Sequence, residues 1–265
     1  MRHLVFGDVH GNLDAFEVVL AEGERRGAET YLFVGDLVGY GPCPLECIER
    51  LLPLQERGSL AWVPGNHELV VRGEVDPEGY STEALETLAW TRRLLEANES
   101  AREFVAAPTL RAEVNNGIWL THDSLAEPGR AGYHRWPQNA KSELACLRFE
   151  GGRICFYGHT HQMRAEFTAE IGDVMMVPME AHEGDGRDPH PLRPGPDALA
   201  WIGTGSVGFP TNPRRLAEFL IFDDESWTVE KYATAYPREK ARERVMKTLS
   251  APCGRAVGEQ IARWL

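Results

Sequence analysis

Residues 4–12 read LVFGDVHGN and establish the pattern that recurs along the chain. A short apolar run ends at Gly7 and is followed at once by Asp8 and His10, which are side chains that bind metals. Residues 12–27 then carry apolar side chains at helical spacing, so they predict a helix with Asn12 as its N-cap. The stretch therefore predicts a buried strand, a polar turn that carries ligand-type side chains, and a helix.

Four further apolar runs end in the same way. Residues 31–34 precede Gly35-Asp36, residues 60–63 precede Gly65-Asn66-His67-Glu68, residues 118–120 precede His122-Asp123, and residues 154–157 precede Gly158-His159-Thr160-His161. Short continuous apolar runs that alternate with helices favour a sheet buried on both faces. Because such sheets bind ligands at the carboxyl ends of their strands, we expect the five polar clusters to meet at one edge.

The rest of the chain predicts few further helices. Residues 44–57, which Pro53 should interrupt or kink, and 80–106 predict helices, and 237–265 predict a helical tail. Segments 164–177, 198–204, 217–222 and 227–232 predict strands of a second, largely antiparallel sheet. Residues 182–197 are rich in Pro, Gly and charge, and they predict a long loop and a candidate lid. No linker is evident, so we expect a single domain over 1–265 with its core over about 1–235.

Composition excludes several classes of protein. The chain has 265 residues, with 40 acidic side chains against 28 basic ones and a net charge of −12, which argues against generic binding to nucleic acid or anionic lipid. No apolar run approaches the roughly 18 residues that a membrane span needs, and no secretory signal is recognisable, so we expect a cytoplasmic protein without a membrane partner. Five sparse cysteines do not form a disulfide framework.

The polar clusters indicate metal chemistry. Carboxylate, amide oxygen and imidazole ligands suit Mn, Fe, Zn, Co or Ni, and the absence of cysteine argues against a closed structural zinc site. The clusters contain about twice the ligands that one ion needs, which predicts two ions and a bridging carboxylate. Two ions about 3.5–4 Å apart can activate a shared water and bind a phosphoryl oxygen.

The ordered blocks D-x-H, G-D, G-N-H-[DE], a lone His and G-H-x-H resemble those of the calcineurin-like metallophosphoesterases over roughly residues 1–235. Residues 39–42 (GYGP) and 205–208 (GSVG) resemble the small bacterial and archaeal phosphodiesterase-like branch. The resemblance implies an α/β (α+β) fold, namely a four-layer αββα sandwich of two mixed β-sheets flanked by helices. It also implies a dimetal site at the carboxyl ends of the strands.

The resemblance further implies residue roles. The first metal would be held by Asp8, His10 and His161, and the second by Asn66, His122 and His159. Asp36 would bridge the two ions, among which Mn is favoured for activity, and a dimetal-bridging hydroxide would be the nucleophile. His67 would bind phosphate and act as general acid, for which an imidazole is suited near neutral pH.

The second block departs from part of the family. In the phosphoprotein phosphatases and diadenosine tetraphosphate hydrolases it reads G-D-x-V-D-R-G. Gly39 replaces the Asp that partners the catalytic histidine there, and Tyr40 replaces the Arg that binds phosphate. Both differences weaken the interpretation of the chain as a phosphoprotein phosphatase or a diadenosine tetraphosphate hydrolase. Glu68 is a weak candidate for orienting His67, and we expect Asp123 to be solvent-exposed.

Substrate contacts outside these blocks are open to two interpretations. Asn12 is a candidate phosphate contact or only a helix cap. Arg130, Tyr133 and Arg135 are candidate contacts to a base and a phosphate, or part of a surface loop. We expect a phosphoesterase acting on phosphodiesters of small molecules or nucleotides. A phosphomonoesterase or protein phosphatase, and a nucleotide-binding regulatory protein with little turnover, are the alternatives, and the sequence does not predict the oligomeric state.

Overall fold

The computed structural model describes residues 1–106, 108–115, 117–129, 140–168, 174–184, 186–188, 190–195 and 197–265. The strands are β1 (Arg2–Phe6), β2 (Thr30–Phe33), β3 (Leu60–Trp62), β4 (Arg111–Asn115), β5 (Ile118–Thr121), β6 (Ile154–Tyr157), β7 (Met163–Thr168), β8 (Val174–Pro178), β9 (Leu199–Thr204), β10 (Ala217–Asp223) and β11 (Thr228–Thr234). The helices are α1 (Leu13–Arg25), α2 (Pro44–Glu56), α3 (Asn66–Arg72), α4 (Thr82–Glu96), α5 (Glu99–Ala106), α6 (Ala140–Phe149), α7 (Arg238–Leu249) and α8 (Arg255–Trp264).

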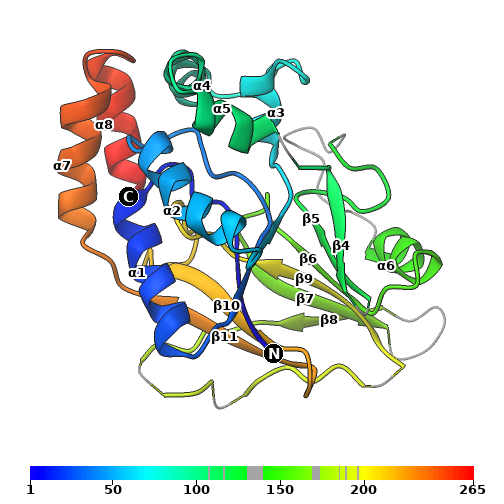
Figure 1. Ribbon diagram of the computed structural model, residues 1–265. Helices are drawn as coiled ribbons and strands as arrows, with labels where there is room; N and C mark the ends of the chain where they lie inside the picture. Colours follow the sequence, from blue (N-terminus) through cyan, green and yellow to red (C-terminus); the bar gives the residue numbers. More distant parts are fainter. Residues whose placement is uncertain are drawn as a thin grey trace.

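The strands form two mixed sheets (Figure 1). One has the order β11-β10-β1-β2-β3, with β1, β2 and β3 parallel and β10 and β11 antiparallel. The other has the order β4-β5-β6-β9-β7-β8, with β5, β6 and β9 parallel. The expected sandwich of two mixed sheets is confirmed. The expectation that the late strands form a separate antiparallel sheet is wrong, because β10 returns to pair with β1 and places Ile221 opposite Leu4.

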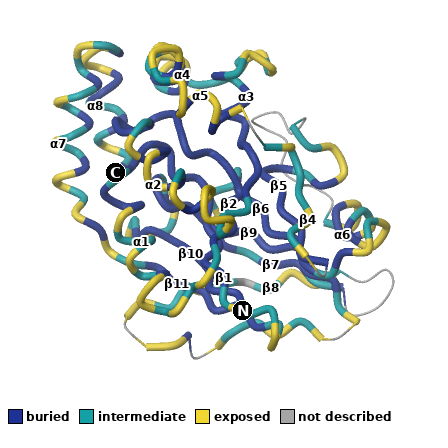
Figure 2. Tube along the Cα trace, viewed as in Figure 1, coloured by how far each residue is buried: buried dark blue, intermediate teal, exposed yellow. Residues whose placement is uncertain are grey.

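The central strands of each sheet are buried on both faces, which explains the continuous apolar runs. Along β1, Val5 packs into the cluster between the sheets, while Leu4 and Phe6 pack outward against the helices. On the far side, α6 covers the second sheet through Leu147, which clusters with Trp201 of β9. The order of layers is therefore helices, sheet, sheet and helix, and the central strands are deeply buried while the edge strands β4 and β8 are partly exposed (Figure 2).

Several local expectations changed. Helix α2 continues through Pro53 without interruption. Segment 164–177 divides into the paired strands β7 and β8. Strand β4 and helix α6 have no counterpart among the predicted elements. Within the described residues, no helix has both the length and the apolar character needed to cross a membrane.

Candidate functional site

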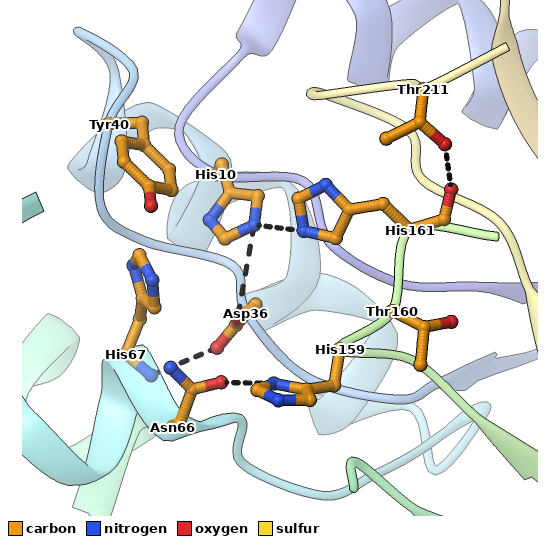
Figure 3. A pocket seen from close by; sticks show the side chains of 9 residues that line it. All are labelled: His10, Asp36, Tyr40, Asn66, His67, His159, Thr160, His161 and Thr211. Atoms are coloured by element: carbon orange, nitrogen blue, oxygen red, sulfur yellow. Dashed lines mark hydrogen bonds and ion pairs between the residues drawn. The ribbon is translucent and has the colours of Figure 1, made fainter. Parts of the chain in front are cut away.

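The five polar clusters meet where the carboxyl ends of the two sheets come together. Figure 3 shows side chains from four of them, namely His10, Asp36, Asn66, His67, His159 and His161. Asp36 follows β2 in one sheet and His122 follows β5 in the other, and Asp36 Oδ2 lies 3.3 Å from His122 Nε2. Asp8, after β1, places Oδ1 3.3 Å from His161 Nε2, after β6. The expected convergence is confirmed, although it lies between two sheets and not at the edge of one.

The side chains form two groups. In the first, His10 Nε2 lies 3.0 Å from His161 Nε2 and 4.0 Å from Asp8 Oδ1. In the second, Asn66 Oδ1 lies 3.0 Å from His122 Nε2 and 2.8 Å from His159 Nδ1.

Asp36 lies between these two groups. Its Oδ2 is 3.7 Å from His10 Nε2 in the first group and 3.3 Å from His122 Nε2 in the second. One carboxylate therefore reaches both groups of ligand-type atoms.

The donor set fits divalent cations. Backbone carbonyls lie against the Nδ1 atoms of three imidazoles, with Val38 O beside His10, Val34 O beside His122 and Phe209 O beside His161. Because a carbonyl oxygen only accepts, Nδ1 carries the hydrogen, and in the neutral form of each ring Nε2 keeps a lone pair. The lone pairs of His10 and His161 then face each other at 3.0 Å, an arrangement that a cation between them stabilises. Oδ2 of Asp8 is also buried with no hydrogen-bond partner among the described residues.

The turns that carry these ligands are strained. Six of the eight non-glycine residues with positive φ in the described chain lie here, namely Asp8 (51°), His10 (48°), Asp36 (58°), Tyr40 (57°), His159 (62°) and His161 (53°). A left-handed backbone costs a non-glycine residue about 1–3 kcal/mol, so the surrounding bonds must hold the turns. Two sets of such bonds are evident.

Glu68 supplies the first set. Its fully buried carboxylate accepts backbone N–H bonds from Asp36 at 2.8 Å, Leu37 at 2.9 Å, Val38 at 3.1 Å and Gly65 at 2.7 Å. Glu68 thus ties the turn after β2 to the start of α3 and does not orient the neighbouring imidazole. Burial, together with the charge of Asp36, raises the pKa of Glu68 to about 7.

The loop after β9 supplies the second set. The Ser206 hydroxyl and the Gly208 N–H both donate to the carbonyl of Asp8, at 3.0 and 2.9 Å. A Cβ at Gly208 would lie 1.8 Å from the carbonyl oxygen of Val9, so only glycine permits this approach. Asn12 belongs to the same assembly, because it accepts from Ala15 N as the cap of α1 and donates to Gly208 O. The cap interpretation of Asn12 is confirmed, and both ends of its side-chain amide are hydrogen-bonded within the protein.

His67 lies beside the two groups and is 2% exposed. Its backbone N–H donates to Asp36 Oδ1 at 2.9 Å. Its Nδ1 has no partner among the described residues and lies against Gly39, where a Cβ would come within 2.0 Å of that nitrogen. This contact explains the departure in the second block, since the observed backbone leaves no room for an aspartate side chain at position 39.

Two polar residues were missed or misjudged by sequence reasoning. Tyr80 accepts from Asn66 Nδ2 at 2.6 Å, which turns Asn66 Oδ1 toward the two histidines of its group. Asp123 is 5% exposed and accepts from Ser124 N and Gly129 N, so the expectation of exposure is wrong. Its carboxylate instead orders the turn after His122.

A cavity of about 250 Å³ opens over the site. It is lined by His10, Asp36, Tyr40, Asn66, His67, His159, Thr160, His161 and Thr211, so no lysine or arginine is among its described lining residues. Arg130, Tyr133 and Arg135 lie outside the described residues. In loop 182–197, His182 and Leu192 pair with β11, and the described part of the loop does not line this cavity, which gives no support to a lid.

Burial disfavours the charged form of every ionisable group here. It lowers the pKa of His10 and His67, and it lowers that of His159 to about 4. At His122 the negative charge of Asp36 outweighs burial and raises the pKa to about 10. The pKa of Asp36 is in turn held well below its ordinary value, despite burial, by the charges of His122 and its other histidine neighbours. The low pKa keeps the Asp36 carboxylate ionised, which is the form that binds a cation.

Comparisons with known proteins agree with this geometry. Residues 1–163 match the model of the family described as calcineurin-like phosphoesterase. The chain is 27% identical over 245 residues to the uncharacterized protein MJ0912 of Methanocaldococcus jannaschii, which covers 92% of this chain and 91% of that one. It is 31% identical over 148 residues to bis(5'-nucleosyl)-tetraphosphatase PrpE of a Geobacillus species, which covers 47% of this chain and 58% of that relative.

Among solved structures, a metallophosphoesterase from Sphaerobacter thermophilus shares the fold with a TM-score of 0.75 and 24% identity, covering 100% of this chain and 99% of that one. The family match spans more than half of the sequence and contains all five polar clusters, the last of which ends at His161. The chain therefore belongs to the calcineurin-like phosphoesterases, a family of metal-dependent hydrolases.

Proposed function

We propose that this chain hydrolyses phosphodiesters of small molecules or nucleotides at a two-metal site. The observation that carries the proposal is the position of Asp36, whose carboxylate reaches both groups of ligand-type atoms. One ion would be held by Asp8, His10 and His161, the other by Asn66, His122 and His159, with Asp36 shared. Two divalent ions would supply an activated water and polarise a phosphoryl oxygen. They would also outweigh the two carboxylates, so the site would attract phosphate in a chain whose net charge is −12.

His67 is the proposed proton donor to the leaving oxygen. Nδ1 of its ring lies against Gly39, which leaves Nε2 as the nitrogen available to substrate in the cavity that His67 lines. The bond from its backbone N–H to Asp36 fixes the main chain of His67 relative to the shared carboxylate. A general acid in this role is expected to contribute about 10²–10⁴-fold to the rate.

The cavity favours small diesters over phosphoproteins. It has a volume of about 250 Å³, and no lysine or arginine is among its described lining residues. A dianionic phosphomonoester gains more from an arginine than a monoanionic diester does, so a described lining without lysine or arginine favours the diester. The local likeness to a bis(5'-nucleosyl)-tetraphosphatase is a further reason to include nucleotides among the substrates.

The test is a substrate panel run with Mn, Fe, Zn, Co and Ni. It compares bis(p-nitrophenyl) phosphate, p-nitrophenyl phosphate, cyclic nucleotides, dinucleotides and phosphopeptides. We expect a diester to give the highest kcat/KM, with Mn the most effective ion. Metal-loaded protein that hydrolyses none of these esters would refute the function, and a preference for phosphopeptides would support the phosphatase alternative.

A further inference from the structure

Three aromatic rings from distant parts of the chain form one aromatic block beside the site, made of Tyr40, Phe209 and Trp264. Tyr40 stacks on Phe209 with the ring centroids 4.8 Å apart and the planes at 28°. Trp264 meets both rings nearly at right angles, at 5.7 Å from Tyr40 and 5.8 Å from Phe209. Edge-to-face contacts of this kind fix ring orientation as well as burying apolar area.

The block is anchored from behind by the last helices. Arg238 of α7 donates to the carbonyl of Leu265, and Arg242 donates to the carbonyl of Ala262 at 3.1 Å. Leu265 is 1% exposed, so the end of α8 is packed into the protein. These contacts hold Trp264 against the other two rings.

The front of the block faces the site. The ring of Tyr40 lies 5.0 Å from that of His10 and 5.0 Å from that of His67, and Tyr40 lines the cavity. Figure 3 shows its hydroxyl end directed into the space between these two histidines. The phenol oxygen therefore lies on the side of Tyr40 that faces His10 and His67.

The backbone gives no reason for a tyrosine here. Tyr40 has φ of 57° between Gly39 and Gly41, a conformation that glycine or asparagine adopts with less strain. Its N–H donates to the hydroxyl of Thr87 at 3.0 Å, which fixes the turn but needs no particular side chain. The contribution of Tyr40 is therefore made by its aromatic ring and its hydroxyl group.

We infer that Tyr40 is a substrate-binding residue whose hydroxyl donates a hydrogen bond to a non-bridging oxygen of a monoanionic phosphodiester, with Phe209 and Trp264 as its positioning residues. The inference rests on the proposed function. A neutral donor strengthens binding of the phosphate without adding the full charge that a guanidinium brings. Tyrosine in place of the arginine of the phosphoprotein phosphatases would then change which phosphate esters bind, and would not simply remove a phosphate contact.

The test compares Tyr40→Phe with the wild type, because the variant keeps the stacked ring and removes only the hydroxyl. A hydrogen bond to a charged group corresponds to about 10- to 100-fold, so kcat/KM for bis(p-nitrophenyl) phosphate should fall by that factor. Metal content and Tm should stay at wild-type values. Tyr31→Phe is the matched control, since Tyr31 is buried at the opposite end of β2 and should leave kcat/KM unchanged.

Inorganic phosphate separates this inference from the proposed function. Its Kd for the metal-loaded protein should rise by about tenfold in Tyr40→Phe. If the wild type hydrolyses no ester, the proposed function fails, while the phosphate Kd still tests the role of Tyr40. Wild-type values of both kcat/KM and Kd in Tyr40→Phe, with metal content equal, would overturn the inference.

The positioning role of Trp264 is tested separately. Trp264→Phe should retain most of the activity, and Trp264→Ala should raise KM for the diester. No change in KM in Trp264→Ala would refute the positioning role.

Discussion

Replacing Glu68 with glutamine tests how the strained turn after β2 is held. The two carboxylate oxygens divide four backbone N–H bonds evenly. Oε1 accepts from Leu37 and Val38, and Oε2 accepts from Asp36 and Gly65. A glutamine has one oxygen and one NH₂ group, so in either orientation of the amide two buried N–H groups face a donor.

The magnitude follows from those two groups. Each buried donor that loses its acceptor costs about 1–3 kcal/mol, so Glu68→Gln should lower the free energy of unfolding by about 2–6 kcal/mol. For a chain of this size that corresponds to a fall in Tm of roughly 5–20 °C. Because the same turn carries Asp36, the affinity for Mn should fall as well.

Thermal and urea unfolding of the metal-free protein measure the first effect, and isothermal titration with Mn measures the second. The measurements belong at a pH well above the pKa of Glu68, about 7, so that the wild-type carboxylate is ionised. Glu49→Gln, on the exposed face of α2, is the matched control and should change neither quantity. A Glu68→Gln variant within about 0.5 kcal/mol of the wild type would refute the argument that this carboxylate holds the turn.

Three further predictions follow from single contacts. His67→Ala should keep its metal and lose kcat by at least about 100-fold, whereas equal loss of metal would make His67 a ligand. Gly39→Ala should reduce kcat with metal retained, because its Cβ would come within 2.0 Å of the His67 ring. Gly58→Ala controls for backbone strain alone, since Gly58 has φ of 70° and a Cβ there would have no atom within 4 Å. Equal kcat in the two variants would contradict the proposed contact. Arg244 and Lys240 of α7 hold the pKa of Asp14 below its ordinary value of 3.8, despite burial. The ionised carboxylate therefore stabilises the fold above pH 3.8, and this contribution is lost as the pH falls through the lowered pKa. Urea unfolding should therefore show Asp14→Asn less stable than the wild type at pH 7 and the difference shrinking in acid; a difference independent of pH would contradict this assignment.

The candidate site could be predicted from the sequence because each strand end is marked locally. An apolar run, a turn and a ligand-type side chain follow one another within a few residues, as at Phe6-Gly7-Asp8. Parallel strands place such turns at the same end of a sheet, and that rule groups Asp8 with Asp36 and His122 with His159. The contact between Asp36 and His122 joins the two sheets and needed the tertiary structure.

Strand pairing could not be predicted in the same way. Strands β9 and β10 have similar apolar patterns, yet β9 pairs with β6 and β10 pairs with β1. The choice depends on packing between the sheets, where Leu220 of β10 and Ile202 of β9 share one cluster. Strand β4 escaped prediction because it lies at a sheet edge with partly exposed residues and has no apolar run.

The supporting residues were hidden because their partners are remote in sequence. Glu68 contacts a turn about 30 residues earlier, as its bond to Val38 shows, and only the adjacent His67 suggested a role. Tyr40 depends on Trp264, and no local pattern links the two. Their roles follow from the tertiary structure alone.

The central claim, a two-metal site bridged by Asp36, is tested most directly by the number of Mn ions bound per chain. Metal-free wild type and Asp36→Asn are loaded with Mn, passed through a desalting column and measured by inductively coupled plasma mass spectrometry. We expect close to two ions per wild-type chain and fewer than one per Asp36→Asn chain. A wild type that binds at most one ion, or an Asp36→Asn variant that retains two, would contradict the claim.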